Sequence, residues 1–143
     1  MSDQGSNSAP APKATRREWI GLGVLTLACL VYSMDLTVLN LAIPRISEDL
    51  KPSSVQLLWI IDIYGFLVSG ALITAGTLGD RIGRRKLLLV GAAWFAVASL
   101  FAAFSTSPEM LIASRAAMGI AGATIAPSTL SLIFTMFLDP QQR

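Results

Sequence analysis

The sequence predicts an all-α membrane protein with four transmembrane helices. Hydrophobic residues make up 53% of the 143 residues and charged residues only 14%, whereas an ordinary soluble domain carries roughly 25% charged residues. The mean hydropathy is +0.61. The apolar residues gather in four runs, each long enough to cross a hydrocarbon core about 30 Å thick as a helix.

The composition also limits the chemistry that the chain can perform. There is no histidine, which excludes histidine-based metal sites, catalytic triads and proton relays, so proton chemistry would have to use carboxylates. The single cysteine, Cys29, cannot form an intrachain disulfide. The net charge of +2 is too small to indicate a nucleic-acid partner. The expected partner of the apolar runs is the lipid bilayer.

The first apolar run spans residues 19–40. Residues 1–18, rich in Ser, Ala, Pro and polar side chains without apolar periodicity, are expected to form a disordered cytoplasmic tail. We expect Pro44 to end the first helix, because proline removes a backbone donor. A polar connection follows over residues 47–54, where Ser53 or Ser54 can cap the next helix.

The other three runs span residues 57–78, 87–105 and 110–138. Near the start of the second, Trp59 and Tyr64 are interpreted as aromatic side chains at the membrane interface. In the fourth run Pro127 is expected to kink the helix without ending it, because neighbouring helices can satisfy the freed backbone groups.

The distribution of cations predicts the orientation. Cytoplasmic segments carry an excess of Lys and Arg. With the amino terminus inside, the outer segments hold only Arg45 and Lys51. The eight cations of the inner segments are Lys13, Arg16, Arg17, Arg81, Arg84, Arg85, Lys86 and Arg143. Both ends of this chain are therefore expected in the cytoplasm of a multi-pass cell-membrane protein.

Three ionisable residues lie inside the apolar runs: Asp35, Asp62 and Arg115. Each costs on the order of 2.5 to 3.5 kcal/mol at the centre of a membrane helix, so each needs a partner or a function. Counted from the ends of their runs, all three lie roughly 8 Å from the outer boundary. The agreement in depth indicates a shared site for a proton or substrate; a charge cluster that only holds the bundle together is the structural alternative.

Two helix faces combine small residues with these charges at three- and four-residue steps. The first face comprises Asp62, Gly65, Ser69, Ile73, Gly76 and Asp80. The second comprises Arg115, Gly119, Gly122 and Ala126. Small residues let helices approach closely, which explains both faces structurally. A face that also carries a buried charge indicates a cavity instead. Near Asp35, the polar residues Ser33, Thr37 and Asn40 could bind a neighbouring helix or a ligand.

The segment Gly76 to Leu89 joins the second and third runs through a charge-dense stretch. Positive-inside topology accounts for its basic residues, but not for Asp80 or for the spaced glycines at 76, 79 and 83. The pattern Gly-x-x-x-Asp-Arg-x-Gly-Arg-Arg-Lys resembles the loop between the second and third helices of the major facilitator superfamily of secondary transporters.

Other stretches resemble that superfamily's fourteen-span drug:proton antiporters. The run from Asp35 to Pro44 is similar to the first-helix motif Asp-x-Thr-Val-x-Asn-x-Ala-Leu-Pro, with Ile43 in place of Leu. Residues 59–64 look like the start of the second helix, although many members carry Thr or Asn in place of Asp62. Residues 111–123 resemble the fourth-helix motif associated with proton transfer, with Met118 replacing a frequent Gln.

The resemblance implies a carrier, not an enzyme, that exports hydrophobic and in particular cationic drugs or toxic compounds. No cofactor is expected, because a proton gradient would supply the energy. Asp35 would exchange a proton for a cationic substrate, with Arg115 as its electrostatic partner. A gating segment would tie the transporter halves together at the inner face; its residues are Gly76, Asp80, Arg81, Gly83, Arg84 and Arg85.

Facilitator folds are built from three-helix repeats, so four helices correspond to one repeat and the first helix of the next. The resemblance therefore implies part of an amino-terminal bundle, and we expect the chain to be an amino-terminal portion that is inactive without its later helices. The alternative is a four-span membrane scaffold, regulatory subunit or channel component without transport activity. The reading frame after Arg143 would distinguish the two.

Overall fold

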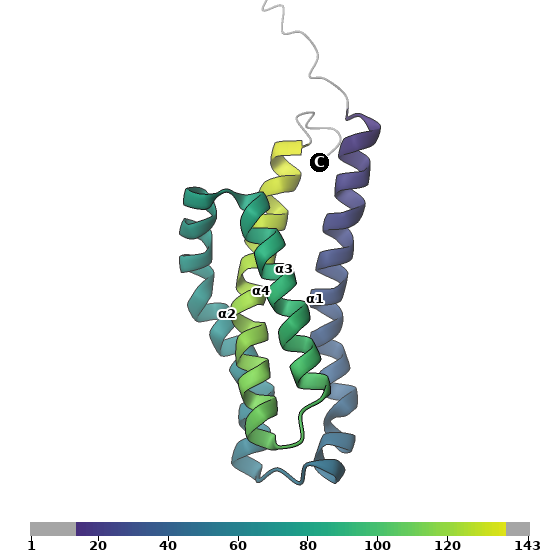
Figure 1. The fold of residues 1–143 in the computed structure, drawn as a ribbon, viewed down its shortest axis with the longest axis vertical. Coiled ribbons are helices and arrows are strands. Elements are labelled where there is room, and N and C mark those ends of the chain that lie inside the picture. Colours follow the sequence, from purple (N-terminus) through teal and green to yellow (C-terminus); the bar gives the residue numbers. More distant parts are fainter. Residues whose placement is uncertain (1–13, 137–143) are drawn as a thin grey trace, which may run out of the picture.

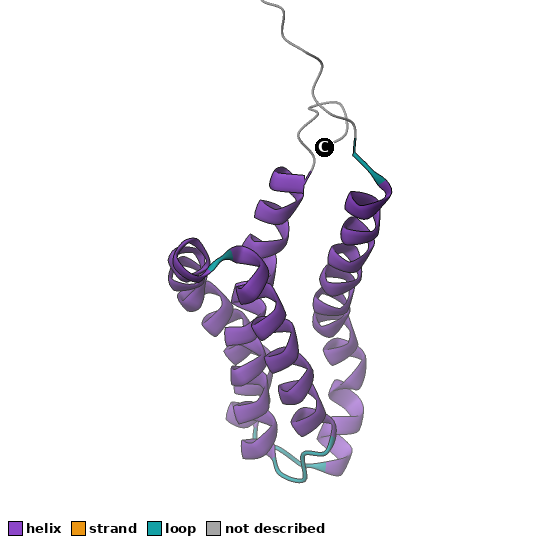
Figure 2. Ribbon diagram, turned by 45° about the horizontal axis from the view of Figure 1, so that its top comes forward, coloured by secondary structure: helices purple, strands orange, loops and turns teal. Residues whose placement is uncertain are grey.

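The computed structural model describes residues 14–136, which form four α-helices joined by short connections (Figures 1 and 2). Their bounds are α1 Arg16–Asp49, α2 Ser54–Ile82, α3 Arg84–Ala103 and α4 Pro108–Met136. All four are long and apolar enough to cross a membrane. The sequence prediction of an all-helical membrane fold with four spans is thus confirmed for the described residues.

Local side-chain chemistry explains where the first two helices begin. Thr15 and Glu18 form a reciprocal capping box at the start of α1, so the helix already includes the last three residues of the predicted tail. At the start of α2, the backbone N–H of Gln56 donates to Ser53 Oγ at 3.2 Å and that of Ser53 donates to Gln56 Oε1 at 2.9 Å. Ser53 is therefore the cap.

The prediction that Pro44 ends the first helix is wrong. Helix α1 continues through Pro44 to Asp49, and the N–H of Leu50 donates to the carbonyl of Ile46 at 3.0 Å. Proline removes one backbone donor, and the turns on each side keep their own hydrogen bonds. The connection to α2 is accordingly shorter than the predicted residues 47–54. Residues 1–13 of the predicted tail and 137–138 of the fourth run lie outside the described residues.

The predicted loop between the second and third runs is almost entirely helical. Only Gly83 separates α2 from α3, and its φ of 99° lies in a region that favours glycine. Across this reversal, Arg84 Nη2 donates to Asp80 Oδ1 at 2.7 Å. Close packing accompanies the turn, because a methyl group at Gly79 would lie 2.9 Å from Arg84 Cδ.

Helix α4 is the centre of the bundle. It packs extensively against α2 and α3 and to a lesser extent against α1. Glycines allow the close approach: a methyl group at Gly119 would lie 2.8 Å from the carbonyl oxygen of Tyr64, and one at Gly91 would overlap the hydroxyl of Thr124. Between α3 and α4, the indole N–H of Trp94 donates to the carbonyl of Ala117 at 3.2 Å.

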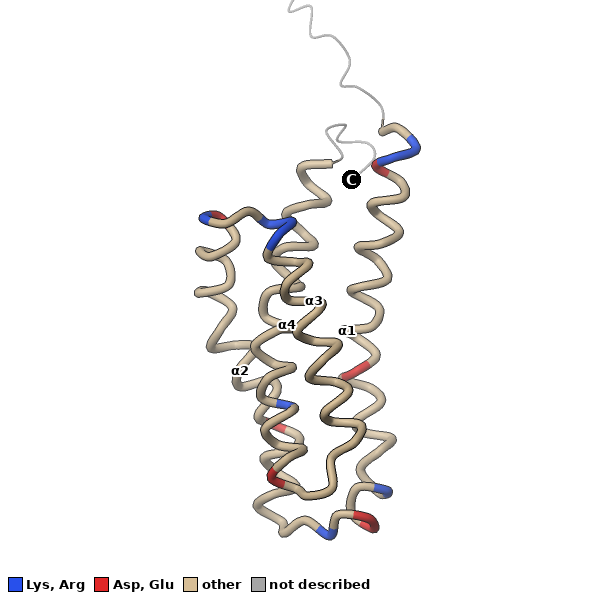
Figure 3. The backbone as a smooth tube through the Cα atoms, in the orientation of Figure 1, with Lys and Arg blue, Asp and Glu red and all other residues tan. Residues whose placement is uncertain are grey.

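The bundle has two charged ends and an apolar outer surface. Figure 3 shows basic residues where α1 begins and where α2 meets α3, and a second charged group at the opposite end. Between the ends, the helices expose many large apolar side chains, including Leu41, Phe66, Ile73 and Trp94. Such a surface is suited to lipid or to further transmembrane helices.

We predict that Gly119→Ala weakens this bundle. The added methyl group would collide with the α2 backbone, and overpacking of this kind costs about 1–3 kcal/mol. Gly65→Ala is the matched control, since a methyl group there meets nothing within 4 Å and alanine favours the helix. Denaturation in detergent micelles, followed by tryptophan fluorescence, should show a loss of stability for Gly119→Ala only. Equal stability of the two variants would contradict the close α2–α4 contact.

Candidate functional site

The candidate site is built around Arg115, a buried arginine on α4. The residue is 3% exposed. Its guanidinium stays charged in proteins and carries donors that need acceptors, so its burial requires partners from the surrounding helices. The structure supplies them from α1 and from α2.

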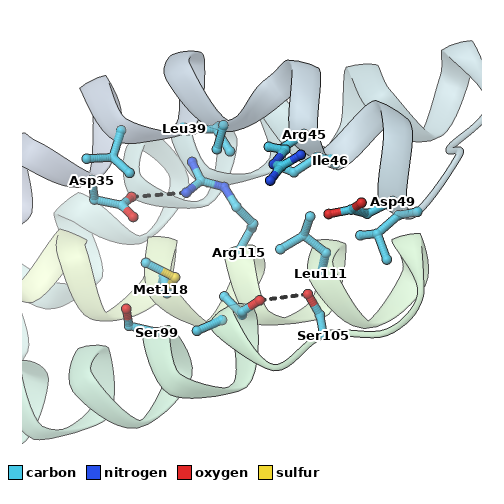
Figure 4. A pocket seen from close by; sticks show the side chains of 15 residues that line it. Asp35, Leu39, Arg45, Ile46, Asp49, Ser99, Ser105, Leu111, Arg115 and Met118 are labelled. Carbon is cyan, nitrogen blue, oxygen red and sulfur yellow. Dashed lines mark hydrogen bonds and ion pairs between the residues drawn. The ribbon is translucent and has the colours of Figure 1, made fainter.

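The partner on α1 is Asp35. Arg115 Nη1 donates to Asp35 Oδ2 at 3.0 Å, and the two side chains are 4% and 18% exposed. Figure 4 shows Arg115 reaching from its helix toward Asp35. Dissolved salt screens such a buried pair much less than an exposed one. This ion pair therefore differs from Arg45–Glu48 on the surface of α1, where both side chains are exposed and the atoms lie 3.8 Å apart.

The partners on α2 were missed at the sequence level. Arg115 Nε donates to the backbone carbonyl of Ile60 at 3.1 Å, and the guanidinium carbon lies 4.8 Å from the centre of the Tyr64 ring. Tyr64 is buried, at 2% exposed, so its interpretation as an interfacial aromatic is wrong. The four-residue spacing of Ile60 and Tyr64 places them on one face of α2, which is the available sequence signal.

Asp62 does not join this group. Two residues rotate a helix by about 200°, so Asp62 lies at the level of Ile60 but on the other side of α2. Its side chain is exposed, and within residues 14–136 it forms no ion pair. The structure therefore brings Asp35 and Arg115 together and leaves Asp62 outside their contact.

The two small-residue faces have different environments. The α2 face is open: methyl groups at Gly65 and Gly76 would meet nothing within 4 Å. The α4 face is packed against protein: a methyl group at Gly122 would lie 2.9 Å from Tyr32 Cε2 and 3.0 Å from the Tyr64 hydroxyl oxygen. The expectation that the α4 face lines a cavity is thus wrong for its two glycines, which serve helix contact.

A groove of about 370 Å³ lies beside the ion pair, between α1, α3 and α4. Apolar side chains such as Leu39, Leu111 and Met118 form much of its wall (Figure 4). Its charged or hydroxyl-bearing residues are Asp35, Arg45, Asp49, Ser99, Ser105 and Arg115. A groove of this composition can bring a small ligand or water to the Asp35 carboxylate.

The polar residues near Asp35 face elsewhere. Ser33 and Thr37 are exposed, and Asn40 Nδ2 donates to the carbonyl of Leu36 on its own helix at 3.2 Å. Among the described residues, no group of three or more His, Cys, Asp or Glu side chains could hold a metal ion. The pair itself offers one carboxylate and one permanent cation, and the groove beside it adds Asp49 and Arg45.

The predicted gating residues form a separate group at the junction of α2 and α3. Asp80 and Arg84 are paired, with side chains 69% and 24% exposed. Arg81 and Arg85 are exposed as well, and Gly83 makes the turn. No described hydrogen bond or ion pair connects these residues to Asp35 or Arg115.

Comparison with known proteins gives a consistent picture. A family model described as Major Facilitator Superfamily matches residues 25–143. The chain is 48% identical over 135 residues to "Multidrug efflux pump LfrA" of Mycolicibacterium smegmatis, covering 92% of this chain and 27% of that protein. It is 42% identical over 127 residues to "Methyl viologen resistance protein SmvA" of Salmonella typhimurium, covering 89% of this chain and 26% of that protein.

A third relative is "Puromycin resistance protein pur8" of Streptomyces alboniger, with 37% identity over 127 residues, 89% of this chain and 25% of that protein. The chain thus spans about a quarter of the length of these curated relatives.

We predict that Asp35→Asn destabilises the chain in detergent, because it leaves the Arg115 charge without its counter-charge. Hydrogen bonds to charged groups contribute about 1.5–3 kcal/mol, so a loss of about 2 kcal/mol is expected. Glu48→Gln, which breaks the exposed pair on the same helix, should change stability by less than about 1 kcal/mol. Denaturation curves that respond equally to both substitutions would show that the Asp35–Arg115 pair carries no special energy.

Proposed function

The chain belongs to the Major Facilitator Superfamily, and on that premise we propose that it is the front portion of a proton-coupled exporter of hydrophobic, cationic drugs or toxic compounds. By name, one relative is a multidrug efflux pump and two are resistance proteins, which supports export as the direction of transport. In this proposal the four helices work together with later helices of the same transporter, and both ends of this chain face the cytoplasm.

The ion pair of Asp35 with Arg115 is the observation that supports proton coupling. A carboxylate can bind a proton, whereas a guanidinium keeps its charge, so Asp35 is the member that can change state. Three cations can then compete for the carboxylate: the proton, the Arg115 guanidinium and a positively charged substrate. Mutual exclusion of proton and substrate at one carboxylate couples their movements in opposite directions, provided that the carrier changes conformation only when the carboxylate is occupied.

The proposed substrate class follows from the same site and from the relatives. The groove beside Asp35 combines apolar walls with two carboxylates, Asp35 and Asp49, and two arginines, Arg45 and Arg115, so its walls suit an apolar molecule, and a positive charge on that molecule could pair with Asp35 or Asp49. One relative is named for resistance to methyl viologen, a compact aromatic dication. A neutral, strongly polar solute would find little complementarity here, because most of the lining residues are apolar.

The Asp80–Arg84 pair supports a role in gating at the inner face. It lies at the junction of α2 and α3, outside the site of Asp35, and Gly83 holds the two helix ends close together. Asp80 is largely exposed, so its carboxylate remains accessible to another segment. Contacts that exist in one transporter state and break in the other change the balance between states.

We predict that Asp35→Asn abolishes proton-driven export while the protein is still inserted in the membrane, since the amide cannot bind a proton at neutral pH. The measurement is dye efflux from vesicles with an imposed pH gradient. The vesicles contain the longest protein that the reading frame of this chain encodes. Glu48→Gln is the control, because Glu48 lies on the same helix and pairs with Arg45, not with Arg115. Wild-type rates in Asp35→Asn would exclude Asp35 as the coupling residue.

We also predict that Asp80→Ala slows turnover without removing substrate binding, because the substitution acts at the junction and not at the groove. Arg84→Ala should show the same pattern, since it removes the other member of the pair. Equilibrium binding of a cationic dye and its transport rate are measured side by side in the two variants. If binding falls in proportion to transport, the gating assignment is wrong.

A further inference from the structure

One turn of α2 holds the Arg115 guanidinium independently of Asp35. The carbonyl of Ile60 accepts a hydrogen bond from Nε at 3.1 Å, and the ring of Tyr64, four residues later, lies 4.8 Å from the guanidinium carbon. A cation over an aromatic face is attracted by the ring, most strongly when water is excluded. Neither contact involves the carboxylate of Asp35.

The packing of the helices also distinguishes the contacts of Arg115 with α2 from its ion pair with α1. Helix α4 lies directly against the α2 backbone, as Gly119 shows by its closeness to the Tyr64 carbonyl, whereas α1 packs against α4 less extensively. Arg115 is therefore attached by backbone and ring to a helix that its own helix contacts closely. Its link to α1 is the ion pair with Asp35.

We propose that Tyr64 is a positioning residue, which together with the Ile60 carbonyl keeps Arg115 on α2 when Asp35 loses its negative charge. The guanidinium then stays in the position in which it can pair again with the Asp35 carboxylate once that group is ionised. One consequence rests on the proposed function. During transport, Asp35 can bind and release a proton or a cationic substrate repeatedly, and Arg115 does not have to be repositioned each time.

The part of Tyr64 that performs this role is the ring face, not the hydroxyl. The hydroxyl is buried without a hydrogen-bond partner among the described residues, so it contributes no polar contact to Arg115. The ring is kept in place by its surroundings: Tyr32 packs at 6.3 Å between ring centres, and Gly122 leaves room for both tyrosines. Phenylalanine should therefore replace Tyr64, and an aliphatic residue should not.

The test is the exchange of the Arg115 Nε proton with water, measured by NMR on the 143-residue chain in detergent micelles. The resonance is assigned by its loss in Arg115→Lys. In Asp35→Asn the proton should remain protected, because the Ile60 carbonyl and the Tyr64 ring are unchanged. Adding Tyr64→Leu to Asp35→Asn should accelerate exchange about tenfold or more, as expected when a desolvated cation–π contact is lost.

Two matched variants separate this role from simple packing. Tyr64→Phe in the Asp35→Asn background should leave exchange slow, because the ring face is kept. Phe95→Leu should also leave it slow, since Phe95 is a buried aromatic of the same core cluster on α3. If Tyr64→Leu does not fold, Tyr64→Met fills the space without an aromatic face and should give the same acceleration. Fast exchange in Asp35→Asn alone, or slow exchange after loss of the ring, would overturn the proposal.

Transport measurements distinguish this proposal from the proposed function. In the longer transporter, Tyr64→Leu should lower kcat for dye export several-fold with little change in KM. Tyr64→Phe, which keeps the ring, should leave kcat close to that of the wild type. Wild-type kcat in Tyr64→Leu would refute the link between anchoring and turnover. Normal export by Asp35→Asn would instead refute proton coupling at Asp35, while the NMR result would still decide whether Tyr64 holds Arg115.

Discussion

The permanent charge of Arg115 is the constraint on which the rest of this bundle depends. A buried guanidinium cannot escape its desolvation cost by losing a proton, so neighbouring helices must provide hydrogen-bond acceptors, a counter-charge or an aromatic face. Helix α1 provides the carboxylate of Asp35, and α2 provides a backbone carbonyl and an aromatic face. Helix α4 itself provides Gly119, one turn after Arg115. Without this glycine the α2 backbone could not come close enough to accept the hydrogen bond from Nε–H.

This requirement also explains why the helices are packed so unequally. Apolar helices gain little from contact with each other in lipid, so close approach depends on small residues and interhelical polar contacts. Helix α4 has a small residue and an interhelical polar contact on each of two sides. Toward α2 these are Gly119 and Arg115, and toward α3 they are Thr124 and the carbonyl of Ala117. Toward α1 the polar link is the ion pair, and a groove remains between them.

The sequence was sufficient for the fold and for half of the site. Hydropathy predicted the four helices. Counting depth along them placed Asp35, Asp62 and Arg115 at one level, and the resemblance implied that Asp35 pairs with Arg115. Depth alone could not exclude Asp62, because the side of a helix depends on a rotation of 100° per residue and on which face meets its neighbour. The carbonyl of Ile60 was missed because a backbone acceptor has no signature in the sequence. Pro44 failed as a stop signal because a helix can lose one hydrogen bond and continue.

The exposed position of Asp62 limits how α2 can lie in a membrane. A carboxylate at the depth of Arg115 would be costly against hydrocarbon, and such residues face a bundle interior or water in membrane proteins. The same face of α2 carries Gly65 and Gly76 without neighbours, which would let another backbone approach closely, together with the exposed Ile73. The outer face of α3, with Trp94, Val97 and Phe101 exposed, has the composition of a lipid-facing surface. Asp62 and these glycines therefore favour water or further protein beside this part of α2, whereas Ile60 and Tyr64, on the other side of the helix, contact Arg115.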